Sequence, residues 1–235
     1  MTVAIIPARG GSKRIPGKNI KAFAGLPMIA HSIRAAQASG LFERILVTTD
    51  SDAITDVARA YGAETPFRRP QELSDDVATT AAVLEHTLLW LREHGQAPAH
   101  ACCLYATAPF VEPADLQRGF DILHGAGASC AFTVTTFPFP IFRALQIREN
   151  GSLAMFWPEH RLTRSQDLPE AYHDAGQFYW VDVGRFLVQR TLYPDDSRPI
   201  VLPRHRVQDI DTLEDWENAE HMFDALSWHK RTGER

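Results

Sequence analysis

Long apolar runs are absent from this chain of 235 residues, since no stretch approaches the roughly 20 consecutive apolar residues that cross a bilayer. The N-terminus also lacks a secretory pattern, because its short apolar run comes before the first charges instead of after them. We therefore expect a cytoplasmic protein with no membrane partner.

Cysteine is scarce, with 3 residues in the chain, and neither a Cys-x-x-Cys pair nor a histidine-rich spacing occurs. A disulfide framework and a structural zinc site are therefore not expected. Cys102, Cys103 and Cys130 lie in apolar runs, and we interpret them as small, buried, reduced side chains.

Acidic residues are absent before Glu43, although the net charge of the whole chain is −5. The overall charge argues against a nucleic-acid partner. The acid-free stretch carries these basic residues: Arg9, Lys13, Arg14, Lys18, Lys21 and Arg34. A local positive field in an acidic protein attracts polyanions, of which phosphates are the most common. Chance clustering is the alternative, and the glycines between the charges argue against it.

Apolar runs alternate with segments of helical periodicity through the first 135 residues. Buried strands are expected at 3–6, 44–49, 101–105 and 129–135, and helices at 27–39, 52–61, 79–94 and 113–123. This alternation predicts an α/β fold with a doubly wound, mainly parallel sheet, in one domain that spans residues 1–235.

The pattern changes after the proline-rich break at 137–140. Asn150-Gly151 predicts a hairpin within 145–156. We expect the segment 137–175 to be inserted or to protrude, where it would contact a second copy of the chain. Beyond it, strands are expected at 177–181, 200–202 and 207–210, and helices at 184–191 and 212–226, the last one capped by Thr212.

The N-terminal basic residues belong to a glycine-rich loop, ARGGSKRIPGKN at residues 8–19, directly after the first expected strand. Ligands bind at this end of a strand in α/β folds, and successive backbone N–H groups can cradle phosphate oxygens. The spacing matches neither a Walker A loop nor the dinucleotide pattern G-x-G-x-x-G. The loop therefore predicts a phosphate site held by backbone amides and basic side chains, with a mobile surface loop as the alternative.

Two Asp-x-Asp pairs are candidates for a metal site. Asp209 and Asp211 would point to the same side of an extended segment, and paired carboxylates beside phosphates are typical of Mg²⁺ sites. Helix capping would explain one of these acids but not both. Asp50 and Asp52 resemble the D-x-D metal motif of glycosyltransferases, but we prefer the interpretation that Asp50 or Ser51 caps the helix at 52–61.

A dense polar stretch occupies residues 164–177. Its arginine, glutamine, tyrosine and histidine side chains suit a polyhydroxylated, carboxylated ligand, because arginine binds carboxylates with two parallel hydrogen bonds. An ordered loop with internal hydrogen bonds explains the composition equally well. His173 is a candidate base, or a structural histidine paired with Asp174.

Taken together, these segments resemble the CMP-sugar synthetases that activate nonulosonic acids and Kdo. The stretch AIIPARGGSKRIPGKNI at 4–20 looks like the opening of that family. RPQELS at 69–74, YATAP at 105–109 and QDIDT at 208–212 follow in the order that the family uses. The resemblance spans nearly the whole chain.

Two further segments, RSQDLP at 164–169 and YHDAGQFYW at 172–180, are similar to the branch of the family that acts on pseudaminic acid. The sialic acid enzymes carry Asn-Gly in place of residues 174–176 and QPTSP in place of YATAP. These departures favour pseudaminic acid over N-acetylneuraminic acid as the expected substrate.

The resemblance implies a Rossmann-like nucleotidyltransferase fold and a reaction between CTP and a 2-keto-sugar acid. The anomeric hydroxyl of the sugar would attack the α-phosphate in line and release pyrophosphate, a reaction in which positioning and charge neutralisation dominate. It also implies homodimers, in which the protruding segment at 137–170 reaches the site of the neighbouring subunit.

The same resemblance implies roles for individual residues. The nucleotide would be bound by Ala8, Arg9, Gly10, Gly11, Ser12, Lys18, Asn19, Arg69 and Thr79. Catalytic roles would fall to Lys18, Asp211 and Arg9. Mg²⁺ would be held by Asp209 and Asp211. The sugar would face Tyr105, Arg164, Gln166, Tyr172 and Gln177.

Three alternatives to this hypothesis stay open from the sequence. The same reaction would be possible on legionaminic acid, N-acetylneuraminic acid or Kdo. A glycosyltransferase would use Asp50 and Asp52. A regulator would bind the nucleotide without catalysis. No residue is indicated as the general base.

Overall fold

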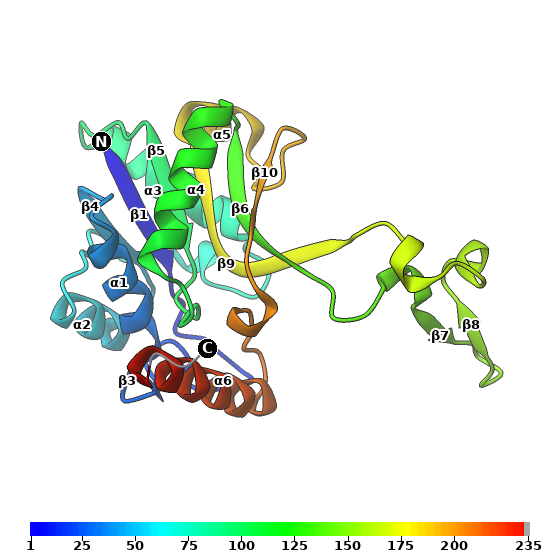
Figure 1. Cartoon of the computed structure of the whole chain (residues 1–235). Coiled ribbons are helices and arrows are strands. Elements are labelled where there is room, and N and C mark those ends of the chain that lie inside the picture. Colours follow the sequence, from blue (N-terminus) through cyan, green and yellow to red (C-terminus); the bar gives the residue numbers. More distant parts are fainter. Residues whose placement is uncertain (233–235) are drawn as a thin grey trace.

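A six-stranded sheet, in the order β10-β6-β9-β5-β1-β4, forms the centre of the computed structural model, which describes residues 1–232 (Figure 1). Its strands are β1 (Thr2–Pro7), β4 (Arg44–Thr48), β5 (His100–Leu104), β6 (Cys130–Thr136), β9 (Tyr172–Asp182) and β10 (Arg198–Val201). β1 runs parallel to β4 and β5, and β6 runs parallel to β10. In this sheet β9 alone is antiparallel to its neighbours, β5 and β6. The expected mainly parallel sheet is confirmed.

Helices cover both faces of the sheet. They are α1 (Met28–Ser39), α2 (Asp52–Ala60), α3 (Thr80–Glu93), α4 (Pro113–Ala126), α5 (Val183–Gln189) and α6 (Leu213–Thr232). Successive residues of β1 point to opposite faces. Ala4 and Ile6 join the core shared with α1, α2 and α4, whereas Val3 and Ile5 join the core shared with α3 and α5. This arrangement is the doubly wound architecture that the sequence predicts.

A third, smaller core joins the loop after β1 to the C-terminal part of the chain. Ile15 of that loop is buried together with Ile210, Trp216, Phe23 and Met28. Phe23 belongs to a short hairpin formed by β2 (Ala22–Phe23) and β3 (Leu26–Pro27), and α6 lies across this end of the body (Figure 1). The third core therefore holds the basic loop beside the segment that precedes α6.

The segment before α6 is extended, but the strand expected at 207–210 does not form. That prediction is wrong because the segment has no partner strand, and the carbonyl of Ile210 instead accepts a hydrogen bond from Lys18 Nζ at 2.6 Å. The expected cap of α6 is confirmed. The hydroxyl of Thr212 accepts from the backbone N–H of Asp215 at 3.2 Å, and the Asp215 carboxylate accepts from the Thr212 N–H at 2.8 Å.

Residues 137–171 form an arm that projects from the body of the structure (Figure 1). Its hairpin consists of β7 (Leu145–Ile147) and β8 (Leu153–Met155), with Gly151 at a φ of +77° in the turn, as expected from the sequence. Residues 172–175, which we expected in the protruding segment, are the first part of β9 in the central sheet. Short 3-10 turns occur at Ile141–Arg143, Pro158–His160 and Ser165–Asp167 in the arm, and elsewhere at Gln71–Leu73 and Arg204–Arg206.

The cysteines are free and buried, as expected from their apolar context. Burial raises the pKa of Cys130 to about 12, so its thiol stays protonated at neutral pH. Among residues 1–232, no helix combines the length and the apolar composition that spanning a bilayer requires.

Candidate active site

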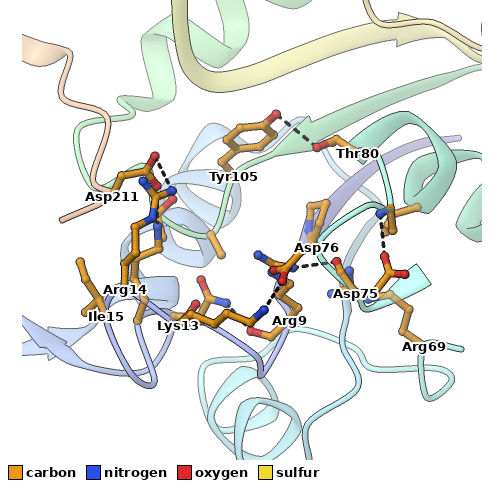
Figure 2. A pocket seen from close by; sticks show the side chains of 18 of the residues that line it. Arg9, Lys13, Arg14, Ile15, Arg69, Asp75, Asp76, Thr80, Tyr105 and Asp211 are labelled. Atoms are coloured by element: carbon orange, nitrogen blue, oxygen red, sulfur yellow. Dashed lines mark hydrogen bonds and ion pairs between the residues drawn. The ribbon is translucent and has the colours of Figure 1, made fainter. Parts of the chain in front are cut away.

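A cavity of about 290 Å³ opens beside the loop that follows β1 (Figure 2). The loop lines one side, the segment from Arg69 to Val83 lines another, and Tyr105 and Asp211 complete the wall. Because β1 and β5 are parallel, the loop after β1 and Tyr105 after β5 meet at the same edge of the sheet. The glycine-rich loop therefore borders a cavity at this edge of the sheet.

Hydrogen bonds give the basic loop a defined shape. Asn19 Nδ2 donates to the carbonyl of Arg9 at 2.9 Å. Gly10 N donates to Asp50 Oδ1 at 2.8 Å, and a Cβ added to Gly10 would lie 3.0 Å from the Cβ of Ser51. Gly10 therefore permits a close approach between this loop and the end of β4 that a larger residue would disturb.

The expected cap of α2 is wrong. No side-chain hydrogen bond from Ser51 or Asp50 closes the start of this helix, and Asp50 supports the basic loop through Gly10. Asp52 points elsewhere and forms an ion pair with Arg68 at 2.6 Å. The two carboxylates of this Asp-x-Asp pair are committed to different partners, which removes the structural support for a glycosyltransferase-type metal site.

Two cations of the loop meet a carboxylate from the opposite wall of the cavity. Arg9 Nη1 lies 2.7 Å from Asp76 Oδ1 and also donates to the carbonyl of Asp75 at 2.7 Å. Lys13 Nζ binds the other oxygen of Asp76 (Figure 2). Hydrogen bonds from Lys13 and then Arg9 lower the pKa of Asp76, so its carboxylate stays charged at neutral pH.

A second pair of cations contacts Asp211 at the other end of the cavity. Arg14 Nη2 lies 2.8 Å from Asp211 Oδ2, and Lys18 Nζ lies 3.3 Å from Asp211 Oδ1. Lys18 is held by the Ile210 carbonyl as well, and its side chain is largely buried. Four of the cations that line the cavity are thus partly neutralised by the carboxylates of Asp76 and Asp211.

Asp209 does not line this cavity but faces a neighbouring one. Asp209 is exposed overall, but its carboxyl is partly shielded from water, and this shielding raises its pKa. The negative charge of Asp211 is the second, smaller cause of the rise in this pKa. The two acids are therefore close enough to influence each other. Within residues 1–232 no cluster of three or more metal-ligating side chains occurs. A cation bound here would have two protein carboxylates as ligands, and waters and phosphate oxygens would fill its other coordination positions. This ligand set suits a hard ion such as Mg²⁺.

Arg69 and Thr79, both expected at the nucleotide, have structural hydrogen bonds. The buried guanidinium of Arg69 donates to the carbonyl of Thr48 at 2.7 Å, and burial lowers its pKa. Arg69 lines the cavity. Thr79 caps α3 by accepting from Ala82 N at 3.2 Å, and its neighbour Thr80 lines the cavity in its place.

The residues expected at the sugar lie in different places. Tyr105 lines the cavity, donates or accepts a hydrogen bond with Thr80 Oγ1 at 3.3 Å, and has its pKa raised by burial. Gln177 is buried and donates to the carbonyl of Arg206 at 2.6 Å. The arm carries Arg164 and Gln166, with Tyr172 at its base. It projects from the body (Figure 1), and the cavity is lined by none of its residues.

His173 has structural contacts, and it also lines a neighbouring cavity. Its Nδ1 lies 2.8 Å from the backbone carbonyl of Asp174, and its ring packs against Phe137. The carboxylate of Asp174 has other partners, two tyrosines of the neighbouring cavity. The expected His–Asp pair is therefore made through the backbone of Asp174 and not through its carboxylate.

Comparison with known proteins identifies the family. A family model described as cytidylyltransferase matches residues 3–205. The chain belongs to this cytidylyltransferase family. A pseudaminic acid cytidylyltransferase of Campylobacter jejuni subsp. jejuni is 42% identical over 221 residues, which cover 94% of this chain and 95% of that protein. A CMP-N,N'-diacetyllegionaminic acid synthase of Legionella pneumophila is 31% identical over 229 residues, covering 94% of this chain and 96% of the other.

Solved structures confirm the nucleotidyltransferase fold of this cytidylyltransferase. A CMP:2-keto-3-deoxy-manno-octonic acid synthetase, solved with CTP, matches with a TM-score of 0.67 at 17% identity over 96% of this chain and 99% of that one. A 4-diphosphocytidyl-2C-methyl-D-erythritol synthase from Anaerococcus prevotii matches with a TM-score of 0.62 at 14% identity over 95% and 98%. At these identities the likeness establishes the fold alone.

Proposed function

We propose that the chain transfers CMP from CTP to the anomeric hydroxyl of pseudaminic acid and releases pyrophosphate. The observation that carries the proposal is 42% identity, over nearly the whole of both chains, to a pseudaminic acid cytidylyltransferase. The cavity supports it, because its basic loop presents the charges that a triphosphate needs. The relative named as a legionaminic acid synthase is less similar, and transfer to that acid is the nearest alternative.

CTP would lie along the basic loop in this proposal. Arg9, Ser12 and Lys18 would hold the phosphates. Backbone N–H groups of the loop would add to them, other than those of Ala8 and Gly10, which donate to Thr48 and Asp50. Asn19, Arg69 and the wall near Thr79 would contact the cytidine. Lys18, Arg9 and Asp211 would be the catalytic residues.

Asp209 and Asp211 would hold Mg²⁺ in this proposal. When bound, the ion neutralises charge on the phosphates and so favours attack by an oxygen nucleophile. Of the chain's own residues, Arg14 and Lys18 are placed to neutralise and orient Asp211, since both contact its carboxylate. A substrate phosphate would compete with Asp211 for these cations.

The arm suggests that the working unit is a homodimer. Many of its large apolar side chains are exposed, namely Phe139, Leu145, Ile147, Leu153, Phe156 and Leu162. An apolar surface of this kind marks an interaction site. A second copy that covers it would receive Arg164, Gln166 and Tyr172 at its own acceptor site, where Arg164 would bind the carboxylate of the sugar acid. We place this dimer in the cytoplasm, where CTP is available.

A mixing experiment tests the shared site. Lys18→Ala disables the nucleotide side and Arg164→Ala disables the arm, so each pure variant is expected to be inactive. If the arm serves the neighbouring subunit, subunit exchange produces heterodimers with one intact site and restores part of the activity. Exchange without recovery, with dimers confirmed by light scattering, would place Arg164 in its own subunit's site or in none.

The reaction itself is tested by its dependence on each component. Pyrophosphate release should require CTP, Mg²⁺ and pseudaminic acid together, and mass spectrometry should detect the CMP-sugar. A regulator that binds the nucleotide without catalysis would bind CTP and release no pyrophosphate. That result would overturn the proposed function.

A further inference from the structure

A second cavity, of about 490 Å³, adjoins the nucleotide cavity because Tyr105 lines both. It extends from Tyr105 to Asp209, and its wall includes Asp174, Tyr179 and Tyr193. Its position between Tyr105 and Asp209 places it where a second substrate could approach a nucleotide bound along the basic loop. Asp174 belongs to the polar stretch at 164–177, whereas the sequence motifs indicate no binding role for Tyr179 or Tyr193.

Asp174 organises the polar side of this cavity. Its Oδ1 accepts from the backbone N–H of Gly176 at 2.7 Å. Its Oδ2 accepts from the hydroxyl of Tyr193 at 2.6 Å and from the hydroxyl of Tyr179. The two phenol oxygens lie 3.3 Å apart. One carboxylate thus gathers two tyrosine hydroxyls that come from different parts of the chain.

A break in the register of the sheet makes this convergence possible. Phe132 of β6 pairs with Tyr179 of β9, but Val134, two residues later, pairs with Asp174. The extra residues of β9 form a bulge with Gly176 at a φ of +61°, a conformation that favours glycine. The bulge brings the carboxylate of Asp174 back toward the phenol of Tyr179, five residues further along the same strand.

The direction of these hydrogen bonds determines what the cavity can recognise. A phenol that donates its only proton to Asp174 keeps its oxygen lone pairs as acceptors. Burial, followed by the bond to Asp174, raises the pKa of Tyr193 to about 12, and burial also raises the pKa of Tyr179, so both phenols stay protonated at neutral pH. The two oxygens can therefore accept hydrogen bonds from N–H or O–H groups of a ligand.

We infer that Asp174 is a positioning residue that turns the hydroxyls of Tyr179 and Tyr193 into acceptors for the amide N–H or hydroxyl groups of the sugar acid that receives CMP. This inference rests on the proposed function, because it assigns the second cavity to the acceptor of that reaction. Tyr193 is half-exposed at the mouth of the cavity, whereas Tyr179 is fully buried. Tyr193 is therefore the member of the pair that can be altered without disturbing the core.

Two variants test the inference. Tyr193→Phe removes one acceptor and keeps the ring. In Asp174→Asn the amide oxygen keeps the bond from Gly176 N–H, so the amide NH₂ replaces the oxygen to which both phenols donate and reverses both bonds. Tyr61→Phe is the matched control, since Tyr61 follows α2 and lines neither cavity. Both test variants should raise the KM for pseudaminic acid about tenfold, as expected for the loss of one hydrogen bond. The KM for CTP and the melting temperature of Tyr193→Phe should stay at the wild-type values.

Competition with Kdo, which carries hydroxyls where pseudaminic acid carries acylamino groups, identifies the donor. If the inhibition constant of Kdo is unchanged while the KM for pseudaminic acid rises, the tyrosines accept from an amide N–H. If both rise, they accept from a hydroxyl that the two acids share. Either result supports the inference. An unchanged KM for pseudaminic acid in Tyr193→Phe would overturn it, as would an equal rise in the KM for CTP, which indicates a structural role.

A separate readout distinguishes failure of this inference from failure of the proposed function. Ligand-detected NMR measures binding of pseudaminic acid to the wild-type protein and to Tyr193→Phe, in the presence of CTP without Mg²⁺. If the wild-type protein binds the acid but releases no pyrophosphate when Mg²⁺ is added, the proposed function fails. The tyrosine contact is then supported if Tyr193→Phe binds the acid more weakly than the wild-type protein, and refuted if it binds equally well. Turnover with equal binding to both proteins refutes the tyrosine contact alone.

Discussion

Arg9 Nη1 lies 2.7 Å from the carboxylate of Asp76, on the far wall of the cavity, and Lys13 binds the same carboxylate (Figure 2). Asp76 therefore acts as a counter-anion for Arg9, which would hold the phosphates of CTP, and for the neighbouring cation Lys13. A bound triphosphate has to compete with this carboxylate. The pair thus predicts a measurable effect on nucleotide affinity.

Asp76→Asn should strengthen CTP binding, because it removes the competing charge from Arg9 and Lys13 while keeping a similar shape. A modest gain of about threefold is expected, since exposed ion pairs are weak. Calorimetric titration of CTP, with no sugar acid present, measures it. Asp52→Asn is the control, as Asp52 pairs with Arg68 outside the cavity. Weaker binding by Asp76→Asn would show that Asp76 contributes to the grip on the nucleotide.

Lys18→Ala and Asp211→Ala should each lower kcat/KM by at least about two orders of magnitude, or roughly 3 kcal/mol of transition-state stabilisation. Lys18 is expected to lose a phosphate contact, and Asp211 a metal ligand. Steady-state kinetics with CTP and pseudaminic acid measure the effect. Lys21→Ala, a cation that lies over Trp216 outside the cavity, serves as the control. Near-normal kinetics in either variant would remove that residue from the mechanism.

Two glycines of α4 should respond oppositely to alanine. A Cβ at Gly119 would lie 2.6 Å from Ile200 and 2.7 Å from Trp180, both fully buried. Gly119→Ala should therefore destabilise the fold by about 1–3 kcal/mol through overpacking. A Cβ at Gly125 meets nothing within 4 Å, so Gly125→Ala should stabilise the helix by about 0.5–1 kcal/mol. Urea unfolding compares them, and equal effects would contradict this packing.

His31 should make stability depend on pH. Burial lowers its pKa and the charge of Arg34 acts in the same direction, outweighing the opposing hydrogen bond to the carbonyl of Phe23. The neutral ring is thus favoured in the folded state. Its contribution is complete above the unfolded pKa of about 6.5 and is lost as the pH falls through the lower folded pKa.

The free energy of unfolding should therefore decrease between about pH 7.5 and pH 5.5. His31→Gln, which can still donate to the Phe23 carbonyl, should show a smaller decrease over the same range. Urea unfolding at several pH values measures both proteins. His94→Gln is the control, because His94 lies at the exposed end of α3. Identical pH profiles for wild type and His31→Gln would show that His31 does not titrate in this window.

Local patterns were enough to predict the frame of the site. The apolar run of β1 and the basic glycine loop after it are contiguous in sequence, and their position at a sheet edge follows from the α/β pattern. The cap of α6 by Thr212 was also visible, because a capping box needs residues only three apart.

Features that depend on distant partners could not be predicted in this way. Asp76 forms an ion pair with Arg9, and Asp174 accepts a hydrogen bond from Tyr193. The residues around each acid in the sequence do not indicate its distant partner. The sequence predicts that Asp50 or Ser51 caps α2 because both residue types fit that local pattern, yet the partner of Asp50 is Gly10 in the loop after β1. The segment at 207–210 has apolar residues that fit a strand, but it forms none because no other strand lies beside it to pair with, which the local sequence does not reveal.

The identity of the acceptor is the central claim, and a turnover assay with CTP and a panel of sugar acids tests it most directly. Pseudaminic, N,N'-diacetyllegionaminic and N-acetylneuraminic acids and Kdo are compared under the same conditions, with pyrophosphate release as the readout. We predict that kcat/KM is at least about tenfold higher for pseudaminic acid than for each of the others. A higher value for another acid, or no release with any of them, would contradict the account.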